Sequence, residues 1–151
     1  MIEHEFQTTV ARSPEEVFDF LVDFRNEPQW EPNCREVEKT SDGPIGQGTT
    51  FRANMKGMGR VESEIVEFER PARFASRDRA RGMDGRSEFR FDAKNGGTQV
   101  SGKLRMQPQG LMRVFEPLMR PKMKRMLGDL PENMRRGIDA SDRLREHPPV
   151  D

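Results

Sequence analysis

At 151 residues the chain has the length of one domain, and charged residues make up 34% of it, with 26 basic and 26 acidic side chains. No apolar run approaches the ~18 residues that a membrane span requires, and the first residues do not have the character of a signal peptide. The single cysteine, Cys34, excludes an internal disulfide and there are two histidines, so we expect a cytoplasmic protein with neither a metal nor a cofactor.

The N-terminal segment has the pattern of a half-buried strand. Apolar and polar side chains alternate over residues 2–10, which predicts a strand with one face turned toward the core. His4 and Phe6 belong to the inner face of this predicted strand.

A helix start follows this strand. Ser13 has the properties of an N-cap, Pro14 suits the first helical position, and Glu16 is spaced to complete a capping box. Apolar residues then recur at helical spacing, which predicts a helix over 14–23. A short second helix is expected over 25–30, before the chain turns to strands.

The middle of the chain predicts an antiparallel sheet. Short alternating segments are separated by turn residues, among them a turn at 82–85 and the pair Asn95–Gly96, which is preferred in type I′ hairpins. Every segment has one polar face, which is typical of antiparallel strands with one solvated side. Six strands are expected after the first: 34–41, 48–56, 60–69, 73–80, 86–92 and 98–106.

The C-terminal part predicts a long helix. Apolar residues at helical spacing from Leu111 to Ile138 form one stripe. Three prolines interrupt it: Pro117, Pro121 and Pro131. Each proline removes a backbone hydrogen-bond donor. We therefore expect that the helix starts late or bends, or that it stops at 128–132 and is followed by a second helix. Residues 141–151 are expected to form a frayed polar tail.

Several local motifs together resemble one protein family. The features are Ala11–Phe18 opening the first helix, the segment Asp23–Trp30, the turn Ser41–Pro44 leading to Gly46–Thr49, and the long terminal helix. The chain resembles the START-like or SRPBCC (birch-pollen-allergen-like) superfamily, in particular its bacterial polyketide cyclase/dehydrase branch. The resemblance covers about residues 1–140, which we expect to be a single START-like domain.

The resemblance implies an α+β helix-grip fold. In this fold a seven-stranded antiparallel sheet wraps around a long C-terminal helix, with two short helices after the first strand, and encloses an apolar cavity. Members of the superfamily bind lipids, sterols, polyketides and other hydrophobic molecules, and only some are enzymes. The chain contains no tyrosine, a residue that aromatases of this family often use.

Inward positions of the predicted strands and helices supply candidate ligand-binding residues. Their side chains are mostly aromatic residues and methionines, which adapt to irregular ligands, with two serines that could hydrogen-bond a carbonyl. The candidates are Phe6, Trp30, Phe51, Met55, Phe74, Ser76, Ser87, Phe89, Met106, Phe115, Met119 and Met123.

Two inward-facing titratable residues are candidates for acid–base chemistry. His4 has a side chain whose pKa neighbours can tune, and Asp78 could act as an acid or a base. Each also has a structural interpretation: His4 bonded to a backbone carbonyl or solvent, and Asp78 either paired with Arg77, Arg79 or Arg90 or turned outward by a bulge. Cys34 has no basic neighbour in sequence, so we expect it to be a buried side chain with a packing role only.

Three functions are compatible with these patterns. The first is non-catalytic binding or carriage of a hydrophobic small molecule, and the second is a cyclase, aromatase or dehydratase that uses His4 or Asp78. The third is a module that docks an anionic membrane or an acidic protein through a basic helix face: Arg113, Arg120, Lys122, Lys124 and Arg125.

The distribution of charge agrees with the third function but does not require it. Residues 1–70 carry 8 basic and 15 acidic side chains, whereas residues 71–151 carry 18 and 11. Nucleic acid is not expected as a partner, because aromatic residues are not interleaved with the basic ones. The chain could be a monomer or a homodimer.

Overall fold

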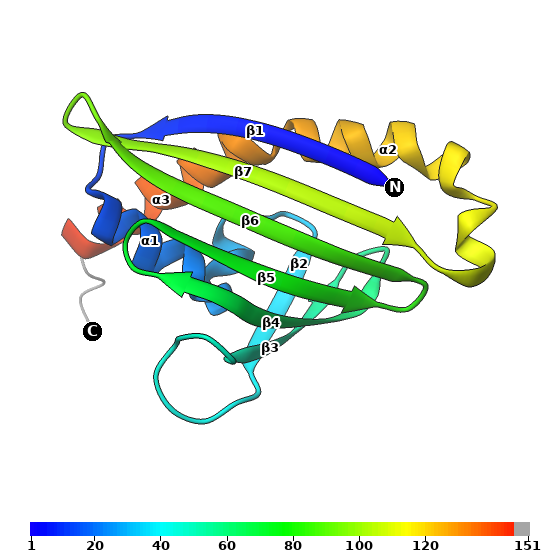
Figure 1. Cartoon of the computed structure of the whole chain (residues 1–151). Coiled ribbons are helices and arrows are strands. Elements are labelled where there is room, and N and C mark those ends of the chain that lie inside the picture. The colour runs from blue at the N-terminus through cyan, green and yellow to red at the C-terminus, as the bar shows by residue number, and fades with distance from the viewer. Residues whose placement is uncertain (147–151) are drawn as a thin grey trace.

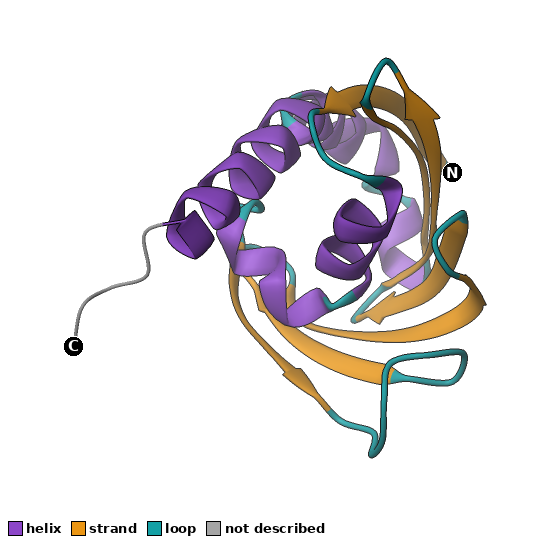
Figure 2. Ribbon diagram, turned by 90° about the vertical axis from the view of Figure 1, so that its left-hand side faces the viewer, coloured by secondary structure: helices purple, strands orange, loops and turns teal. Residues whose placement is uncertain are grey.

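One curved antiparallel sheet and a set of helices on its concave side make up the protein (Figures 1 and 2). The computed structural model describes residues 1–146. The elements are β1 (Ile2–Val10), α1 (Pro14–Val22), the 3₁₀ helix η1 (Phe24–Gln29), β2 (Cys34–Lys39), β3 (Thr50–Met55), β4 (Gly59–Glu69), β5 (Arg73–Ala80), β6 (Met83–Lys94), β7 (Gly97–Pro108), the 3₁₀ helix η2 (Gly110–Arg113), α2 (Glu116–Gly128) and α3 (Leu130–Glu146).

The order of strands in the sheet is β1-β7-β6-β5-β4-β3-β2, and each neighbouring pair is antiparallel. From β2 onward each strand therefore pairs with its neighbour in sequence, and β1 forms the far edge by pairing with β7. The curvature places the inner face of the sheet opposite α1, η1 and α3 (Figure 2). The predicted seven-stranded helix-grip architecture is confirmed.

Local sequence signals explain where the first helix and the main hairpin form. The Ser13 hydroxyl accepts the backbone N–H of Glu16 at 3.3 Å, as the N-cap prediction requires. The Glu16 carboxylate lies 3.7 Å from the Arg12 guanidinium, so it faces that cation and the second half of the predicted capping box is not observed. Asn95 and Gly96 have φ angles of 50° and 78° and join β6 to β7 by the expected tight turn.

An aromatic cluster between α1 and the sheet forms the core. The ring of Phe18 on α1 meets the rings of Phe68, Phe74 and Phe91 edge-on, with centroids 5.3–5.7 Å apart. Phe74 in turn stacks on Phe89 at 5.0 Å. Edge-to-face and offset contacts are the preferred aromatic geometries, so this cluster contributes more than its buried area alone.

The sixth strand is longer than predicted, and the turn before it is shorter. The two glycines of residues 82–85 predict a turn there, but β6 already begins at Met83. Gly85 pairs with Asp78 inside the sheet, where an added Cβ would lie 3.0 Å from the carbonyl oxygen of Arg105. The glycine thus permits a close approach between two strands rather than a turn.

The long terminal helix of the prediction is divided into three pieces. A short 3₁₀ turn, η2, precedes α2, and Asp129 separates α2 from α3, so the predicted alternative of a stop and a second helix is the correct one. The predicted apolar stripe is also not continuous in burial. In α3 the side chains of Leu130, Met134 and Ile138 are buried, whereas no residue of α2 is buried.

The C-terminal end differs from the predicted tail boundary. Helix α3 extends to Glu146, six residues beyond the last residue expected before the tail. The remaining part of that predicted tail, 147–151, lies outside the described residues. Within the described part of the chain, no helix is both long and apolar enough to cross a membrane.

Candidate functional site

A cavity of about 200 Å³ lies between the inner face of the sheet and the helices. It forms where the strands change from large to small inward side chains. Along β5 the inward residues run from Phe74 through Ser76 and Asp78 to Ala80, and β6 repeats this change from Phe89 to Ser87 and Gly85. The aromatic ends fill the core, and the small ends leave space.

The wall of the cavity is largely apolar, with a few polar side chains. Helical residues from α1, η1, α2 and α3 face inward-pointing residues of strands β2 to β7. The lining residues are Leu21, Phe24, Glu27, Trp30, Glu31, Val37, Phe51, Ala53, Met55, Met58, Val61, Ser63, Ser76, Asp78, Ala80, Met83, Gly85, Ser87, Phe89, Leu104, Arg105, Met106, Leu127 and Leu130.

Strand register brings three serines to Asp78. Ser63 of β4 lies directly opposite Asp78, Ser76 precedes it by two residues on the same face, and Ser87 of β6 lies opposite Ser76. The hydroxyl of Ser87 donates to Asp78 Oδ2 at 2.8 Å, and that of Ser76 lies 3.1 and 3.3 Å from the two carboxylate oxygens. The carboxylate is therefore fixed in orientation by hydroxyl groups on three neighbouring strands.

The surroundings of Asp78 act on its acidity in two directions. Burial raises the pKa of Asp78, and the hydrogen bonds from Ser63, Ser87 and Ser76 lower it, with burial the larger effect. The predicted ion pair with a neighbouring arginine does not form with Arg77, whose guanidinium lies 3.1 Å from Asp84 instead. Asp78 is thus a carboxyl group held by neutral donors.

A second carboxyl group faces the cavity from η1. In a 3₁₀ helix residues three apart lie on the same side, and this spacing turns Phe24, Glu27 and Trp30 together toward the cavity. Burial, with the nearby charges of Asp78 and Glu31, raises the pKa of Glu27 from 4.5 to about 8. Glu27 is accordingly protonated at neutral pH and can donate a hydrogen bond into an apolar space.

The predicted site residues divide into two groups. Those that line the cavity are Trp30, Phe51, Met55, Ser76, Asp78, Ser87, Phe89 and Met106. Those that lie outside its lining are His4, Phe6, Phe74, Phe115, Met119 and Met123. The sheet therefore supplies most of what was predicted, and the terminal helix supplies little of it.

Packing explains why the inner face of β1 does not reach the cavity. The Phe6 ring lies over Gly102 of β7, where a Cβ would come within 2.4 Å of ring atoms, so the ring fills the space that glycine leaves. His4 lies next to this ring, with the centroids 6.1 Å apart. Its Nε2 is buried and has no hydrogen-bond partner among the described residues. The structure thus separates the two acid–base candidates, His4 and Asp78.

The three predicted residues at the start of α2 and within it lie outside the cavity lining for a different reason. Because α2 lies along the β1 edge of the sheet rather than beneath its centre, its apolar residues before Leu127 do not line the cavity (Figure 1). Phe115 is half exposed, and Met119 and Met123 are partly covered without lining the cavity. Leu127 at the end of α2 and Leu130 at the start of α3 line it instead.

Sequence reasoning missed several lining residues, above all Glu27 and Ser63. Ser63 could have been found from alternation in its strand, since Val61, Ser63 and Ile65 point the same way. Glu27 could have been found only if the segment around it had been treated as a 3₁₀ helix with a period of three.

The described residues indicate neither a nucleophilic thiol nor a metal-binding site. Cys34 is buried, and burial together with the charges of Glu27 and Glu31 raises the pKa of its thiol to about 12, so it is not a nucleophile. No group of three or more histidine, cysteine, aspartate or glutamate side chains in the described part of the chain is placed to hold a metal ion.

Comparisons with known proteins agree with this architecture. Residues 1–138 match the model of a family described as polyketide cyclase / dehydrase and lipid transport. An uncharacterised protein of Mycobacterium tuberculosis is 32% identical over 146 residues, a match that covers 89% of this chain and 84% of the relative.

Solved structures with low sequence identity share the fold. An aromatase/cyclase from a Streptomyces species superimposes with a TM-score of 0.74 at 16% identity, covering 97% of this chain and 96% of the other. A START superfamily protein from Mycobacterium smegmatis gives a TM-score of 0.71 at 15% identity, with coverage of 95% and 97%. The predicted resemblance to the START-like superfamily is confirmed.

Proposed function

We propose that the cavity binds and carries a hydrophobic small molecule in the cytoplasm. The premise of this proposal is that the chain belongs to the polyketide cyclase / dehydrase and lipid transport family. The observation that carries the proposal is a largely apolar cavity of about 200 Å³ whose wall contains the carboxyl groups of Glu27, Glu31 and Asp78. A dry apolar cavity of ~150 Å³ accommodates benzene, so this volume suits a ligand with one or two rings or a short chain.

The polar wall residues restrict the chemistry of the ligand. Most of the stabilisation would come from burying its apolar surface, at roughly 25 cal/mol per Å² before the costs of binding. Asp78 accepts hydrogen bonds, and Glu27 in its protonated form donates one. A hydroxyl group on the ligand, which both donates and accepts, matches this pair. Ligand orientation would then be set by η1 on one side and by β5 on the other.

Native mass spectrometry of freshly purified protein tests for a bound ligand directly. We expect an adduct that disappears on denaturation and whose mass identifies the ligand class. Displacement of a small apolar fluorophore provides the second measurement on the same protein. A protein with no adduct that also binds no fluorophore would contradict the proposal.

A variant that fills the cavity tests whether the ligand binds in this cavity. Ala53→Leu adds three carbons to the cavity wall, and we expect fluorophore affinity to fall roughly tenfold or more as the space is occupied. Ala93→Leu makes the same change at an exposed position of β6 and serves as the matched control. Equal fluorophore binding by both variants would place the ligand elsewhere.

An acid–base enzyme is the second candidate, favoured by the two carboxyl groups with raised pKa values in one apolar cavity. Asp78 would accept a proton and Glu27 would donate one during a cyclisation, aromatisation or dehydration. His4, the other predicted base, lies outside the cavity lining and is no longer part of this candidate.

Turnover of the co-purified compound separates the two functions. In an enzyme, Asp78→Asn lowers turnover roughly 100-fold or more while fluorophore binding stays within a few fold. In a carrier, the compound returns unchanged from wild-type protein and from the variant.

A further inference from the structure

The end of the molecule formed by η2 and α2 exposes large apolar side chains. Leu111, Leu118 and Phe115 are 83%, 77% and 50% exposed, and Val114 and Met126 are exposed as well. Apart from Met1, these are the large exposed hydrophobic residues among those the structure describes. A cluster of this kind on two consecutive elements indicates an interaction surface, because exposed apolar residues are normally scattered singly over a protein.

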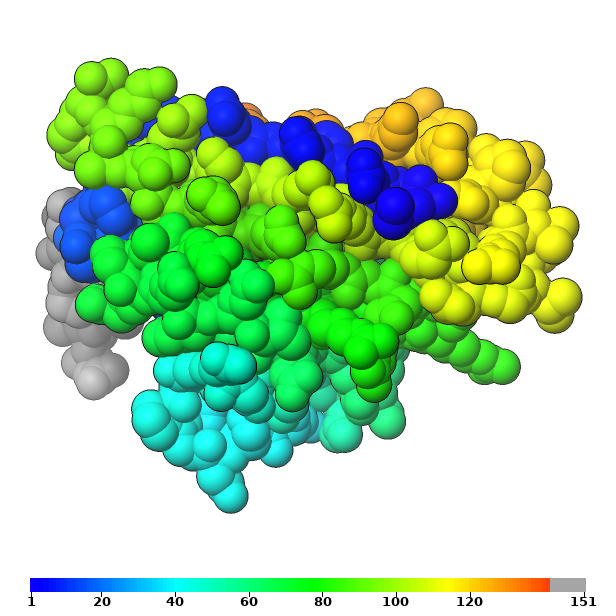
Figure 3. All heavy atoms as spheres, in the orientation of Figure 1, coloured from blue at the N-terminus to red at the C-terminus, as the bar shows by residue number. Residues whose placement is uncertain are grey.

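The exposed residues form one face, which we call the α2 face: Leu111, Val114, Phe115, Leu118, Lys122, Arg125 and Met126. Within α2, Leu118, Lys122, Arg125 and Met126 are three or four residues apart and so lie on one side of the helix. Leu111, Val114 and Phe115 lie in η2 and at its junction with α2. The first part of this face is apolar and the second part carries two cations. Figure 3 shows η2 and the start of α2 projecting at the end of the molecule beside the N-terminus of β1.

The same segment is strongly basic. Residues 110–128 contain five basic side chains and one acidic side chain, Glu116. Glu116 is already paired, since its carboxylate contacts the N-terminal amine and lies 3.2 Å from Arg120. Four positive charges therefore remain uncompensated within the segment, next to its exposed apolar side chains.

We propose that the α2 face docks on an anionic lipid bilayer. A helix with exposed leucine and phenylalanine beside lysine and arginine suits the membrane interface, where apolar side chains enter the acyl boundary and cations meet lipid headgroups. The surface potential of an anionic leaflet attracts such cations at close range. The docked face ends beside Leu127 and Leu130, which line the cavity, so docking would bring the cavity wall to the bilayer.

A second copy of this chain fits the face less well. In an isologous dimer the same patch meets itself, which would place two segments of net charge +4 against each other. An acidic protein would satisfy the cations, but an acidic surface offers little to the leucines and phenylalanine. A bilayer with anionic headgroups satisfies both at once.

Flotation with vesicles tests the proposal, using the full chain. We expect binding to vesicles of phosphatidylcholine with about one third phosphatidylserine, weak binding to phosphatidylcholine alone, and a steep loss of binding as salt is raised. Lys122→Gln with Arg125→Gln should weaken binding roughly 30-fold, at about fivefold per cation. Leu111→Ser with Leu118→Ser should weaken it at least roughly tenfold.

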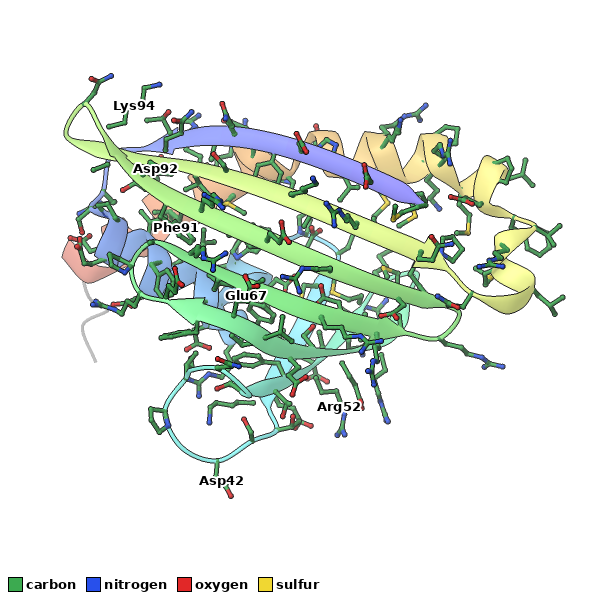
Figure 4. The ribbon with its side chains drawn as sticks, in the orientation of Figure 1. Asp42, Arg52, Glu67, Phe91, Asp92 and Lys94 are labelled. Atoms are coloured by element: carbon green, nitrogen blue, oxygen red, sulfur yellow. The ribbon has the colours of Figure 1, made fainter. Side chains whose placement is uncertain are left out.

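A matched control variant removes the same number of positive charges at positions outside the α2 face. Lys56→Gln with Lys94→Gln removes two exposed cations elsewhere, and Figure 4 shows Lys94 at the tip of the β6–β7 hairpin, away from η2. This control should bind vesicles like wild type. All substituted side chains are exposed, so folding is expected to persist and is checked by circular dichroism.

Three outcomes would overturn the proposal. They are no vesicle binding at low salt, equal loss of binding in the control and the α2-face variants, or a dimer in sedimentation that Leu111→Ser with Leu118→Ser dissociates. The proposal is independent of the ligand, because the vesicle experiment gives the same answer whether or not the cavity is filled.

Discussion

Glu27 and Asp78 are placed in one apolar cavity by two different local structures, a 3₁₀ helix and a β-strand. Their environments differ as well. Burial raises the pKa of both carboxyl groups, but Asp78 also accepts hydroxyl hydrogen bonds that favour its charged form, whereas neighbouring negative charge raises the pKa of Glu27 further. The two carboxyl groups can therefore occupy different protonation states at the same pH.

The raised pKa of Glu27 predicts a pH dependence of stability. Below about pH 4.5 Glu27 is protonated in both the folded and the unfolded chain, and between 4.5 and about 8 only the folded chain keeps the proton. The free energy of unfolding should fall across this window by up to about 1.4 kcal/mol per pH unit. Glu27→Gln removes this contribution, so the variant should be more stable than wild type at pH 8.5 and similar to it near pH 4.5.

Urea unfolding at several pH values measures this difference. Glu36→Gln changes an exposed glutamate on β2 and is the control that should follow the wild-type pH profile. A wild-type profile that runs parallel to that of Glu27→Gln from pH 4.5 to 8.5 would show that the Glu27 carboxyl is solvated.

At the level of elements, the contact between α3 and η1 closes one side of the cavity. Gly137 of α3 lies against the backbone of η1, where an added Cβ would be 2.4 Å from Trp30 Cβ and 3.0 Å from the carbonyl oxygen of Gln29. The close approach of the helix depends on this glycine, and Trp30 lines the cavity on the other side of the contact.

Gly137→Ala should therefore destabilise the protein, although alanine is the better helix former. The new methyl group displaces Trp30 and η1, at about 1–3 kcal/mol for overpacking, against a gain of about 1 kcal/mol in helix propensity. Gly128→Ala at the end of α2 meets no atom within 4 Å and should be neutral or slightly stabilising. Thermal unfolding of the two variants gives the comparison, and equal midpoints would mean that η1 moves aside without cost.

Sequence alone predicted the elements whose signals are local. The Ser13 cap, the Asn95–Gly96 turn and strand alternation each depend on neighbouring residues, and alternation was enough to assign Ser76 and Asp78 to the inner face of β5. Helical periodicity was less informative, because it identifies an apolar face without saying what covers that face. In α3 the sheet covers it, and in α2 it stays exposed.

For the whole molecule, the important division is between a sheet buried on one face and helix α2, which has no buried residue. Strands β6 and β7 pair over their full length, and the aromatic core packs against the sheet. Helix α2 has no buried residue, and Figure 1 shows it at the edge of the fold, beside β1. Elements with few buried apolar contacts open at lower free energy than the global unfolding.

Native-state hydrogen exchange should make this division visible. Amides of residues 119–127 should exchange at least roughly 100-fold faster than those of residues 98–104 in β7, after correction for intrinsic rates. Adding anionic vesicles should slow exchange in α2 selectively if the α2 face docks. Uniform protection of α2 and β7 without vesicles would contradict the independent opening of α2.

The change from large to small inward side chains along β5 and β6 has a consequence for how such a protein can diversify. Aromatic residues of the core, such as Phe74 and Phe91, occupy one end of these two strands, and small residues that shape the cavity, such as Ala80 and Gly85, occupy the other. Mutations at the cavity end alter which molecule fits while leaving the aromatic cluster intact. Ligand preference can thus change among proteins descended from one ancestor while each of them still folds.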